Sequence, residues 1–194
     1  KPDDVNEVVM GNVLTAGVGQ APARQAALKA GLSELTPSTT VNKVCASGMK
    51  SIMIAANQIQ LEEADIIVAG GMESMSNTPY YLPKHRFGSK LGHAKVEDGI
   101  ITDGLWDVYN DFHMGNAAEI CAEDCKISRE DQDEYAITSY KRAISAHENG
   151  YFEDEIITVK VTDRKGKVTE VEMDEELKKV NYDKIPNLKP VFDR

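Results

Sequence analysis

The sequence has no apolar run long enough to cross a membrane. Its longest purely apolar stretches are short, as in Ile66-Ile67-Val68-Ala69, whereas a membrane-spanning helix needs about 20 such residues. No secretory signal or transit segment is recognisable, and we expect the chain to begin inside a domain. Of the 194 residues, 41% are hydrophobic and 28% are charged, a mixture typical of a globular protein rather than a disordered one. The sequence therefore predicts a globular protein with no membrane partner.

Cysteine is also scarce. The three cysteines are Cys45, Cys121 and Cys125, and an odd, sparse set favours a reducing compartment over a disulfide framework. Cys121 and Cys125 stand at positions i and i+4, so on a helix they share one face. A metal site would need two further ligands, and no histidine or cysteine lies nearby at a suitable spacing. We therefore expect these two thiols to be buried in helix packing.

Positive charge is in deficit, since the net charge is −10. An acidic surface is a poor partner for nucleic acid or an anionic membrane, so neither is expected. Two stretches reverse the balance, residues 79–96 with no acidic residue at all and residues 177–194 with five basic residues against two acidic ones (Lys84, Arg86, Lys90 and Lys95; Lys178, Lys179, Lys184, Lys189 and Arg194 against Asp183 and Asp193). They are either solvated loops or a site for a compact polyanion such as a nucleotide phosphate.

The first part of the chain alternates between strand and helix patterns. Residues 4–10 predict a strand, and Pro22 in a first turn with Gly31 just past the end predicts a helix. The β-branched run STTVNKV predicts a second strand, and residues 47–61 have the apolar spacing of a second helix. ADIIVAGG is a short apolar strand of the kind buried in parallel sheets. Strand, helix and strand with tight connections make right-handed βαβ units, so the sequence predicts an α/β fold.

The pattern changes after Ser76, where we place a domain boundary. Residues 78–110 have no clear period and predict a long, ordered excursion of the kind that is usually functional. Beyond it, residues 116–126 predict a helix, and Ser128 followed by Asp131 resembles a capping box that opens a longer helix. EIITVKVT and KVTEVEM, joined by a turn, predict a hairpin.

Cys45 stands at the junction between the second predicted strand and the second predicted helix. The first-turn N–H groups of a helix favour negative charge, and a thiolate stabilised in this way is more reactive at neutral pH. Ala46, Ser47 and Gly48 leave room for a substrate, and α/β enzymes expose a nucleophile at such sharp turns. Most cysteines, however, are buried and inert. The local sequence leaves core packing and nucleophilic catalysis as alternatives.

The surrounding motifs resemble those of one enzyme family. VNKVCASGMKSIMIAANQIQ and ADIIVAGGMESMSNTPYYLP are accompanied by GQAPARQAALKAG, DGLWDVYNDFHMGNAAE, ISREDQDEYAITSYKRA and KIPNLKPVF. Together they resemble the N-terminal half of thiolases, and more narrowly the acetoacetyl-CoA branch, over essentially the whole chain. The resemblance implies that residues 1–76 are part of a core domain with βαβ units in a mixed sheet covered by helices. It implies that residues 77–194 are an inserted α+β loop domain that covers bound coenzyme A (CoA).

The resemblance also implies an activity. It makes Cys45 the nucleophile that accepts an acyl group in the reversible condensation of two acetyl-CoA molecules to acetoacetyl-CoA and CoA. These CoA compounds are the implied small-molecule partners, and no covalent cofactor is implied. Members of the family work as dimers or tetramers, in the mitochondrial matrix or the cytoplasm.

Further residues match family positions around the substrate. Leu105, His113 and Met114 map near the pantetheine and the acyl end of the bound molecule. Tyr140 maps to a tyrosine that lies by CoA and a potassium ion in potassium-activated members.

At the nucleotide end the match is partial. Mitochondrial thiolases read Arg-Val-Asp with a lysine three residues on, and this chain has Lys179, Val180, Asn181 and Lys184 at those positions. A lysine cannot make the planar, bidentate contact of an arginine, and Asn181 lacks the acidic group. Lys184 is therefore the firmest assignment of the four.

Thiolases complete their site with a C-terminal half that carries an Asn-Glu-Ala-Phe motif, a Gly-His-Pro segment and a second cysteine. The sequence contains none of these motifs, and its leading strand is short, so we expect a core that is incomplete at both ends. Such a core exposes a sheet edge and an unpaired apolar face, and it should self-associate. The alternative function is a catalytically incomplete fragment that at most binds CoA or a partner chain.

Overall fold

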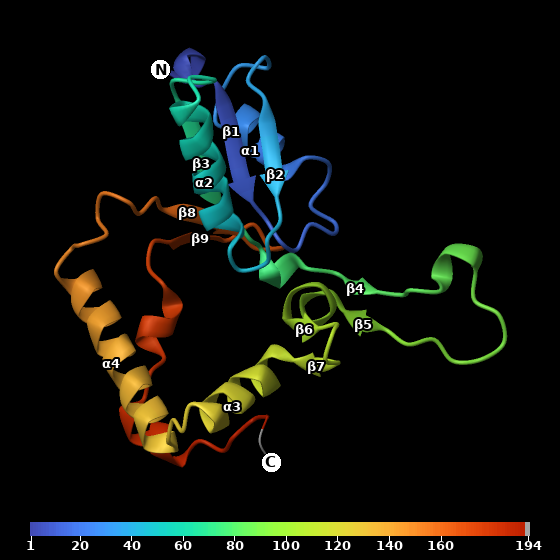
Figure 1. Ribbon diagram of the computed structural model, residues 1–194, viewed down its shortest axis with the longest axis vertical. Helices are drawn as coiled ribbons and strands as arrows, with labels where there is room; N and C mark the ends of the chain where they lie inside the picture. The colour runs from blue at the N-terminus through green and yellow to red at the C-terminus, as the bar shows by residue number, and fades with distance from the viewer. Residues whose placement is uncertain (193–194) are drawn as a thin grey trace. The chain divides into compact units, whose positions relative to one another are not determined.

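The computed structural model describes residues 1–192 (Figure 1). Internal contacts divide the chain into two compact units, one formed by Lys1–Met114 and the other starting at Gly115. The domain boundary predicted after Ser76 concerns the insertion of a loop domain into a core, and it stays a prediction.

A parallel sheet forms the centre of the first unit. Its three strands lie in the order β2-β1-β3, with β1 in the middle. One helix connects β1 to β2 and another connects β2 to β3 (β1 Glu7–Gly11, α1 Pro22–Lys29, β2 Ser38–Val41, α2 Ser47–Gln60, β3 Ile67–Gly71). The α/β fold and its βαβ units, as predicted from the sequence, are confirmed.

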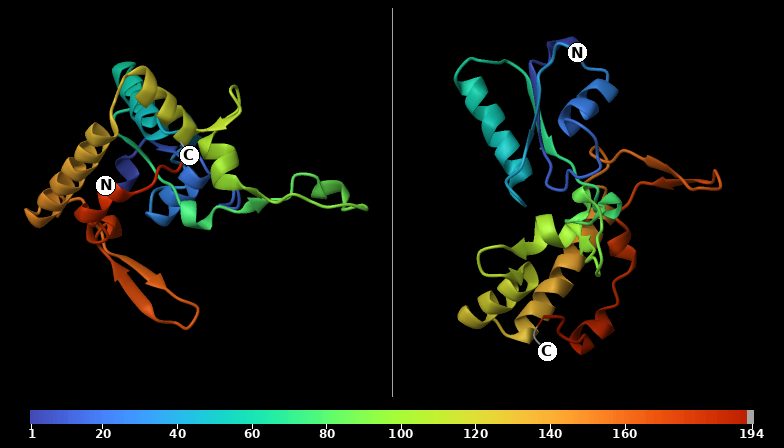
Figure 2. Two further views of the ribbon diagram at one scale, coloured as in Figure 1. Left: turned by 90° about the horizontal axis from the view of Figure 1, so that it is seen from below. Right: turned by 90° about the vertical axis from the view of Figure 1, so that its right-hand side faces the viewer.

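The strand order places the two helices on opposite faces of the sheet. The chain moves from β1 to one neighbour through α1 and then crosses to the other neighbour through α2. Because both crossovers are right-handed, the reversal of direction moves the second helix to the other face. The right-hand view of Figure 2 shows α2 and α1 on either side of the strands. In such sheets ligands bind beyond the carboxyl ends of the strands, where the direction reverses.

Small side chains form most of the buried core of this unit. Val8 and Val9 of β1 are 3% and 0% exposed, and Ala23 and Ala27 of α1 pack on the same strand with similarly low exposure. On the α2 side, the hydroxyl oxygen of the fully buried Ser51 lies 2.6 Å from the carbonyl oxygen of Gly48 and 2.7 Å from that of Gly70 in β3. The small residues let the helices approach the backbone of the sheet closely.

The larger apolar side chains of α2 point away from the sheet. Met49, Ile52 and Met53 are 67%, 56% and 51% exposed, and Ile59 of the same helix is also exposed. Met49 lies about one turn from Ile52 and Met53, and Ile59 lies two turns beyond Ile52, so these residues share one face of the helix. The exposed apolar face that we expected of an incomplete core is therefore present on α2, and faces of this kind mark interaction surfaces.

The remainder of the first unit consists of short elements. Residues 78–110, predicted as an ordered excursion, contain two-stranded antiparallel pairs and tight turns. The short elements of this unit are strands and single helical turns (β4 Tyr80–Tyr81, β5 Glu97–Asp98, β6 Trp106–Asp107 and β7 Phe112–His113; 3₁₀ turns Pro2–Asp4, Met75–Asn77 and His85–Phe87; π-helical turn Ile101–Leu105).

The second unit contains two helices, a hairpin and two 3₁₀ segments (α3 Met114–Asp124, α4 Arg129–Glu148, β8 Val159–Thr162, β9 Val168–Val171, Glu175–Lys178 and Tyr182–Asn187). The two helices and the hairpin are confirmed as predicted. The predicted capping box is also present: the Ser128 hydroxyl accepts from the Asp131 N–H at 3.1 Å, and an Asp131 carboxylate oxygen accepts from the Ser128 N–H at 3.1 Å. Hydrogen bonds from Ser128 lower the pKa of Asp131.

Glycines allow α2 to begin directly against the strand ends. Gly11 and Gly71 are paired in register at the ends of β1 and β3. A Cβ atom on Gly11 would lie 2.5 Å from the Ser47 carbonyl carbon and 2.6 Å from the Gly48 nitrogen, and one on Gly71 would lie 3.4 Å from the Gly48 Cα. The first turn of α2 therefore packs directly against the backbone of β1 and β3.

Gly11→Ala tests this close packing. We expect it to lower the free energy of unfolding by about 2–3 kcal/mol, because the new methyl group meets helix backbone that cannot move aside. The matched control is Gly70→Ala in the neighbouring strand, whose Cβ would only touch the end of the Met10 side chain at 3.7 Å. That change should alter stability by no more than about 1 kcal/mol. Urea denaturation of both variants measures the difference, and equal effects would show that the contact is relaxed at little cost.

Candidate functional site

Cys45 lies in a tight turn between β2 and α2, and it is exposed. Val44 has a φ of 50°, which is strained for a β-branched residue. Hydrogen bonds hold this backbone: Lys43 N donates to the Ser47 hydroxyl at 2.8 Å, and Ser47 N donates to the Val44 carbonyl at 3.0 Å. The turn therefore presents the thiol outward at the carboxyl edge of the sheet, as a nucleophile elbow does.

The N terminus of α2 lies directly beside this thiol. Its first residue is Ser47, and within residues 1–192 no side-chain hydrogen bond caps the helix start. The N–H groups of a first helical turn lack intrahelical partners and favour an anion. The arrangement can stabilise negative charge on the sulfur or on a carbonyl oxygen under attack.

Polar side chains tie together the loops at this edge of the sheet. The carboxylate of Glu73, after β3, accepts hydrogen bonds from the backbone N–H groups of Val13 and Leu14 at 2.9 and 3.0 Å and from the Asn12 amide at 2.8 Å. Asn42, after β2, donates to the Val13 carbonyl at 3.4 Å. Sequence reasoning missed Asn12 and Glu73, although a polar residue directly after each buried strand was a visible signal.

Three of the predicted substrate residues are brought together in the first unit. Leu105 ends the π-helical turn just before β6, His113 ends β7, and Met114 is the first residue of α3. Trp106 pairs with His113 across the antiparallel ladder, so Leu105 and Met114 flank that pair on the same side. Their contact with a substrate stays a prediction.

Asp107 organises the turn that joins β6 to β7. Its carboxylate accepts from the Asn110 side-chain amide at 2.7 Å and from the Tyr109 backbone N–H at 2.8 Å. These hydrogen bonds favour the ionised carboxylate and lower the pKa of Asp107. The turn therefore fixes the register of the β6–β7 pair, in which His113 lies opposite Trp106.

The first basic stretch is a loop of the same unit. Residues 83–97 surround a hollow of about 510 Å³, whose lining includes Lys84, Lys90, His93 and Lys95. Lys95 is paired with Glu97 at 3.5 Å. Both interpretations of this stretch, a solvated loop or an anion site, stay predictions.

The second basic stretch packs against α4 in the second unit. The 3₁₀ segments Glu175–Lys178 and Tyr182–Asn187 both contact α4, which also carries Tyr140. The ammonium of Lys141 lies 5.8 Å from the centre of the Tyr182 ring, within the range of a cation–π contact. Asp193 and Arg194 of the predicted stretch lie outside the described residues.

The predicted nucleotide-binding residues of this stretch have different surroundings. Lys179 is ion-paired with Glu176 at 2.9 Å and Glu175 at 3.2 Å, and the hydrogen bonds that it donates to these carboxylates raise its pKa. Lys184 is exposed and has no ion pair with a carboxylate among residues 1–192. Lys184 is therefore the side chain more readily available to a phosphate, while Val180 and Asn181 lie between the two lysines.

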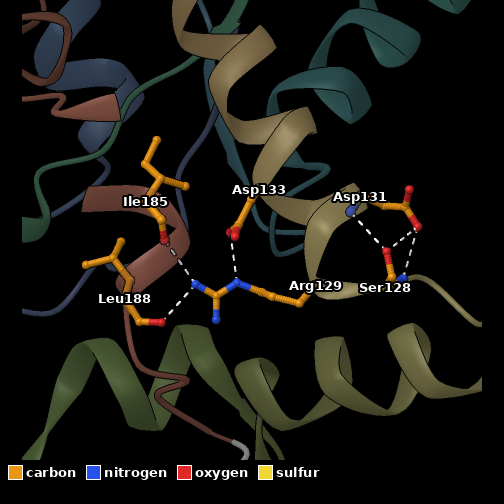
Figure 3. Close-up of polar contacts among 6 residues, drawn as sticks. All are labelled: Ser128, Arg129, Asp131, Asp133, Ile185 and Leu188. Carbon is orange, nitrogen blue, oxygen red and sulfur yellow. Dashed lines mark hydrogen bonds and ion pairs between the residues drawn. The ribbon is translucent and has the colours of Figure 1, made fainter. Parts of the chain in front are cut away.

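Arg129 anchors the same stretch from the start of α4 (Figure 3). Its Nη2 donates to the Ile185 carbonyl at 3.1 Å and to the Leu188 carbonyl at 2.8 Å, and its Nε donates to the Asp133 carboxylate at 2.8 Å. Sequence reasoning found the helix start but not this contact, because the acceptors are backbone carbonyls more than 50 residues away.

A second anchor involves Phe192. A Cβ atom on Gly115, at the start of α3, would lie within 2.1 Å of the Phe192 ring. The ring therefore covers the backbone of the first turn of α3, and Gly115 is the residue that allows it.

The prediction that Cys121 and Cys125 are buried is wrong for this chain. Both thiols are exposed on α3 and its end, because this face of the helix is not covered by other parts of its unit. They do share a face, as predicted, and a hydrogen bond with Cys125 raises the pKa of Cys121.

Residues 1–192 contain neither a helix of membrane-spanning character nor a cluster of acidic, histidine or cysteine side chains that could hold a metal. None of the described helices combines the length and apolar composition of a membrane span. No group of three or more His, Cys, Asp or Glu side chains gathers as metal ligands in the same residues. Tyr140 offers a phenolic oxygen on α4, and the predicted potassium ion beside it stays a prediction.

Comparisons with known proteins give consistent matches. The family model of the thiolase N-terminal domain matches residues 1–194. A probable acetyl-CoA acetyltransferase of Dictyostelium discoideum is 55% identical over 192 residues, which cover 99% of this chain and 46% of that protein. A cytosolic acetyl-CoA acetyltransferase of Gibberella zeae is 53% identical over 193 residues, which cover 99% of this chain and 48% of that protein.

A solved structure is also similar. The thiolase of Ascaris suum, crystallised in complex with coenzyme A, aligns with a TM-score of 0.89 at 37% identity, over 99% of this chain and 48% of that one. The matches confirm the fold class and the family resemblance predicted from the sequence. The chain spans about half the length of the curated relatives it matches.

Cys45 should be the most reactive of the three thiols. We expect iodoacetamide to alkylate it faster than Cys121 or Cys125, because the strained turn exposes it beside the start of α2, whereas the raised pKa of Cys121 lowers the thiolate fraction there. Peptide mapping after timed labelling gives the three rates. Labelling in urea is the control, since unfolding should make the rates converge. A native rate for Cys45 below the other two would contradict a nucleophilic role.

Proposed function

The chain belongs to the thiolase family, as its N-terminal domain, and from that premise we propose that it supplies the nucleophile and part of the CoA site of an acetyl-CoA acetyltransferase. The observation that carries the proposal is the strained turn that presents the exposed Cys45 beside the start of α2. The names of the Dictyostelium and Gibberella relatives support acetyl transfer as the reaction. The CoA complex of the Ascaris suum thiolase supports CoA compounds as the substrates.

In the proposed synthetic direction, the Cys45 thiolate attacks the carbonyl carbon of acetyl-CoA. The carbon–sulfur bond to CoA breaks, CoA leaves as its thiolate and takes up a proton, and an acetyl thioester remains on Cys45. A second acetyl-CoA then loses a proton from its methyl carbon, and this carbon attacks the acetyl group. The Cys45 thiolate leaves, and acetoacetyl-CoA is the product. The first-turn N–H groups of α2 stabilise the oxyanion of each tetrahedral intermediate.

The remaining assignments of the proposal follow the family positions. Leu105, His113 and Met114 lie along the pantetheine and acyl end, Tyr140 lies by CoA, and the nucleotide end contacts the second basic stretch (Lys179, Val180, Asn181 and Lys184). The base that activates Cys45 and the second thiol belong to a C-terminal half of the kind that thiolases have. No step of the proposed reaction depends on potassium.

Oligomerisation and location complete the proposal. The apolar stripe on α2 supports association with further protein, and a dimer or tetramer is proposed on the family resemblance. The cytosolic name of the Gibberella relative supports a cytosolic location. The mitochondrial matrix, expected from the resemblance, gains no support from the relatives described above.

Cys45→Ala should abolish acetyl transfer in the full-length gene product. Incubation of the unaltered protein with acetyl-CoA should add one acetyl group to the peptide that contains Cys45, which mass spectrometry of a peptide digest detects. The variant should lose this adduct and more than about 1000-fold of its turnover, because the covalent route is removed. Cys121→Ala, which removes an exposed thiol elsewhere, is the control and should keep both. Turnover by the Cys45 variant would rule out the proposed nucleophile.

The second candidate function is a fragment that at most binds CoA or a partner chain, and it is favoured by the coverage of about half of each relative. We expect the 194-residue polypeptide by itself to lack acetoacetyl-CoA thiolysis. The physical reason is that no base or second thiol completes the site. A spectrophotometric assay of acetoacetyl-CoA consumption with CoA tests this, and the full-length gene product is the positive control. Thiolysis by the 194-residue polypeptide would show that its own residues complete the site.

A further inference from the structure

The segment that carries Lys184 has little packing of its own. Tyr182–Asn187 is a 3₁₀ segment with Pro186 inside it, and Ile185 is its one buried residue. Short 3₁₀ segments have poorer hydrogen-bond geometry than α-helices. Contacts with α4 must therefore determine where this segment lies.

Two contacts from α4 hold the backbone on either side of Lys184. On the N-terminal side, the Tyr182 ring lies under the ammonium of Lys141, 5.8 Å from the ring centre. On the C-terminal side, one guanidinium nitrogen of Arg129 binds the carbonyls of Ile185 and Leu188, at 3.1 and 2.8 Å. Lys184 is directly followed by Ile185, so the second contact fixes the backbone one residue beyond Lys184.

Asp133 fixes the orientation of Arg129. It lies one turn further along α4 and accepts from the Arg129 Nε at 2.8 Å. The Asp133 side chain is 18% exposed and that of Arg129 39%, so the ion pair is partly shielded from water. Figure 3 shows the guanidinium held between Asp133 on one side and the carbonyls of Ile185 and Leu188 on the other.

Resting on the function proposed above, we propose that Arg129 is a positioning residue for the nucleotide end of CoA. It touches no substrate itself. Through the carbonyls of Ile185 and Leu188 it holds the second basic stretch on α4, so that the exposed Lys184 ammonium can bind a phosphate. The recognised group is a phosphorylated nucleotide attached to the pantetheine arm, and the arm itself is bound elsewhere.

The arginine fork is essential to this role. Its Nε and Nη2 donors are rigidly spaced, and they reach one carboxylate and two carbonyls at once. A lysine has a single charged nitrogen on a flexible stem and cannot satisfy the same three acceptors in fixed geometry. Arg129→Lys therefore keeps the charge and removes the positioning.

The test compares two substrates in the full-length gene product. We expect Arg129→Lys to raise KM for acetoacetyl-CoA about tenfold with little change in kcat, because charge-assisted hydrogen bonds that order the segment are lost. KM for acetoacetyl-pantetheine, which lacks the nucleotide, should stay unchanged. Asp133→Asn should also raise KM for acetoacetyl-CoA selectively, but by a smaller factor. This variant provides the test if the Arg129 variant does not fold. Arg164→Lys, an exposed arginine of the β8–β9 turn, is the matched control and should alter neither KM.

Each other outcome overturns the inference. Equal losses with both substrates would show that Arg129 only supports the fold, and an unchanged KM for acetoacetyl-CoA would show that the anchor is dispensable. The unaltered protein is measured first, to separate this inference from the proposed function. If it turns over neither substrate, the proposed function fails and the inference fails with it. If it uses both equally well, the nucleotide end contributes no binding and only the inference fails.

Discussion

The close approach of α2 to the ends of β1 and β3 is the constraint on which the site depends. Gly11 and Gly71 lack the side chains that would separate the helix start from the strands. With backbone against backbone, the turn from β2 has only a few residues in which to reach the helix, and Val44 adopts a positive φ as a result. The same turn that strains Val44 exposes Cys45 two residues before the start of α2. A side chain at Gly11 would displace the start of α2 and with it the turn that carries Cys45.

The first unit is built with an inner and an outer apolar surface. Small residues such as Ser51 and Ala55 bring α2 close to the sheet, and the larger apolar residues of the helix are left facing outward. An outward apolar stripe on a helix that already packs against a sheet marks an interaction surface. This agrees with a chain that spans about half the length of its relatives, and it makes the outer stripe of α2 the place where further protein would pack.

In the second unit, α3 and α4 hold in place a basic segment that has little packing of its own. Arg129, Lys141 and Gly115 each fix one point of the chain that follows the β8–β9 hairpin, through carbonyls, the Tyr182 ring and the Phe192 ring. Lys179 is already paired with two glutamates, whereas Lys184 is not paired in the described chain. These contacts hold the segment on both sides of Lys184, and the Lys184 side chain itself remains available to a ligand.

The sequence by itself determined the helices and strands and the family, and it predicted Cys45 as the nucleophile. Apolar period, Pro22, the Ser128–Asp131 box and the β-branched strands are local signals, so the helices, strands and βαβ order were predictable, and the motif around Cys45 indicated the family. Only the tertiary structure showed that Cys121 and Cys125 are exposed, that Glu73 binds the loop after β1, and that Arg129 holds the carbonyls of Ile185 and Leu188. These contacts join residues far apart in the chain through backbone groups that every residue has, and for that reason no pattern of side chains in the sequence predicts them.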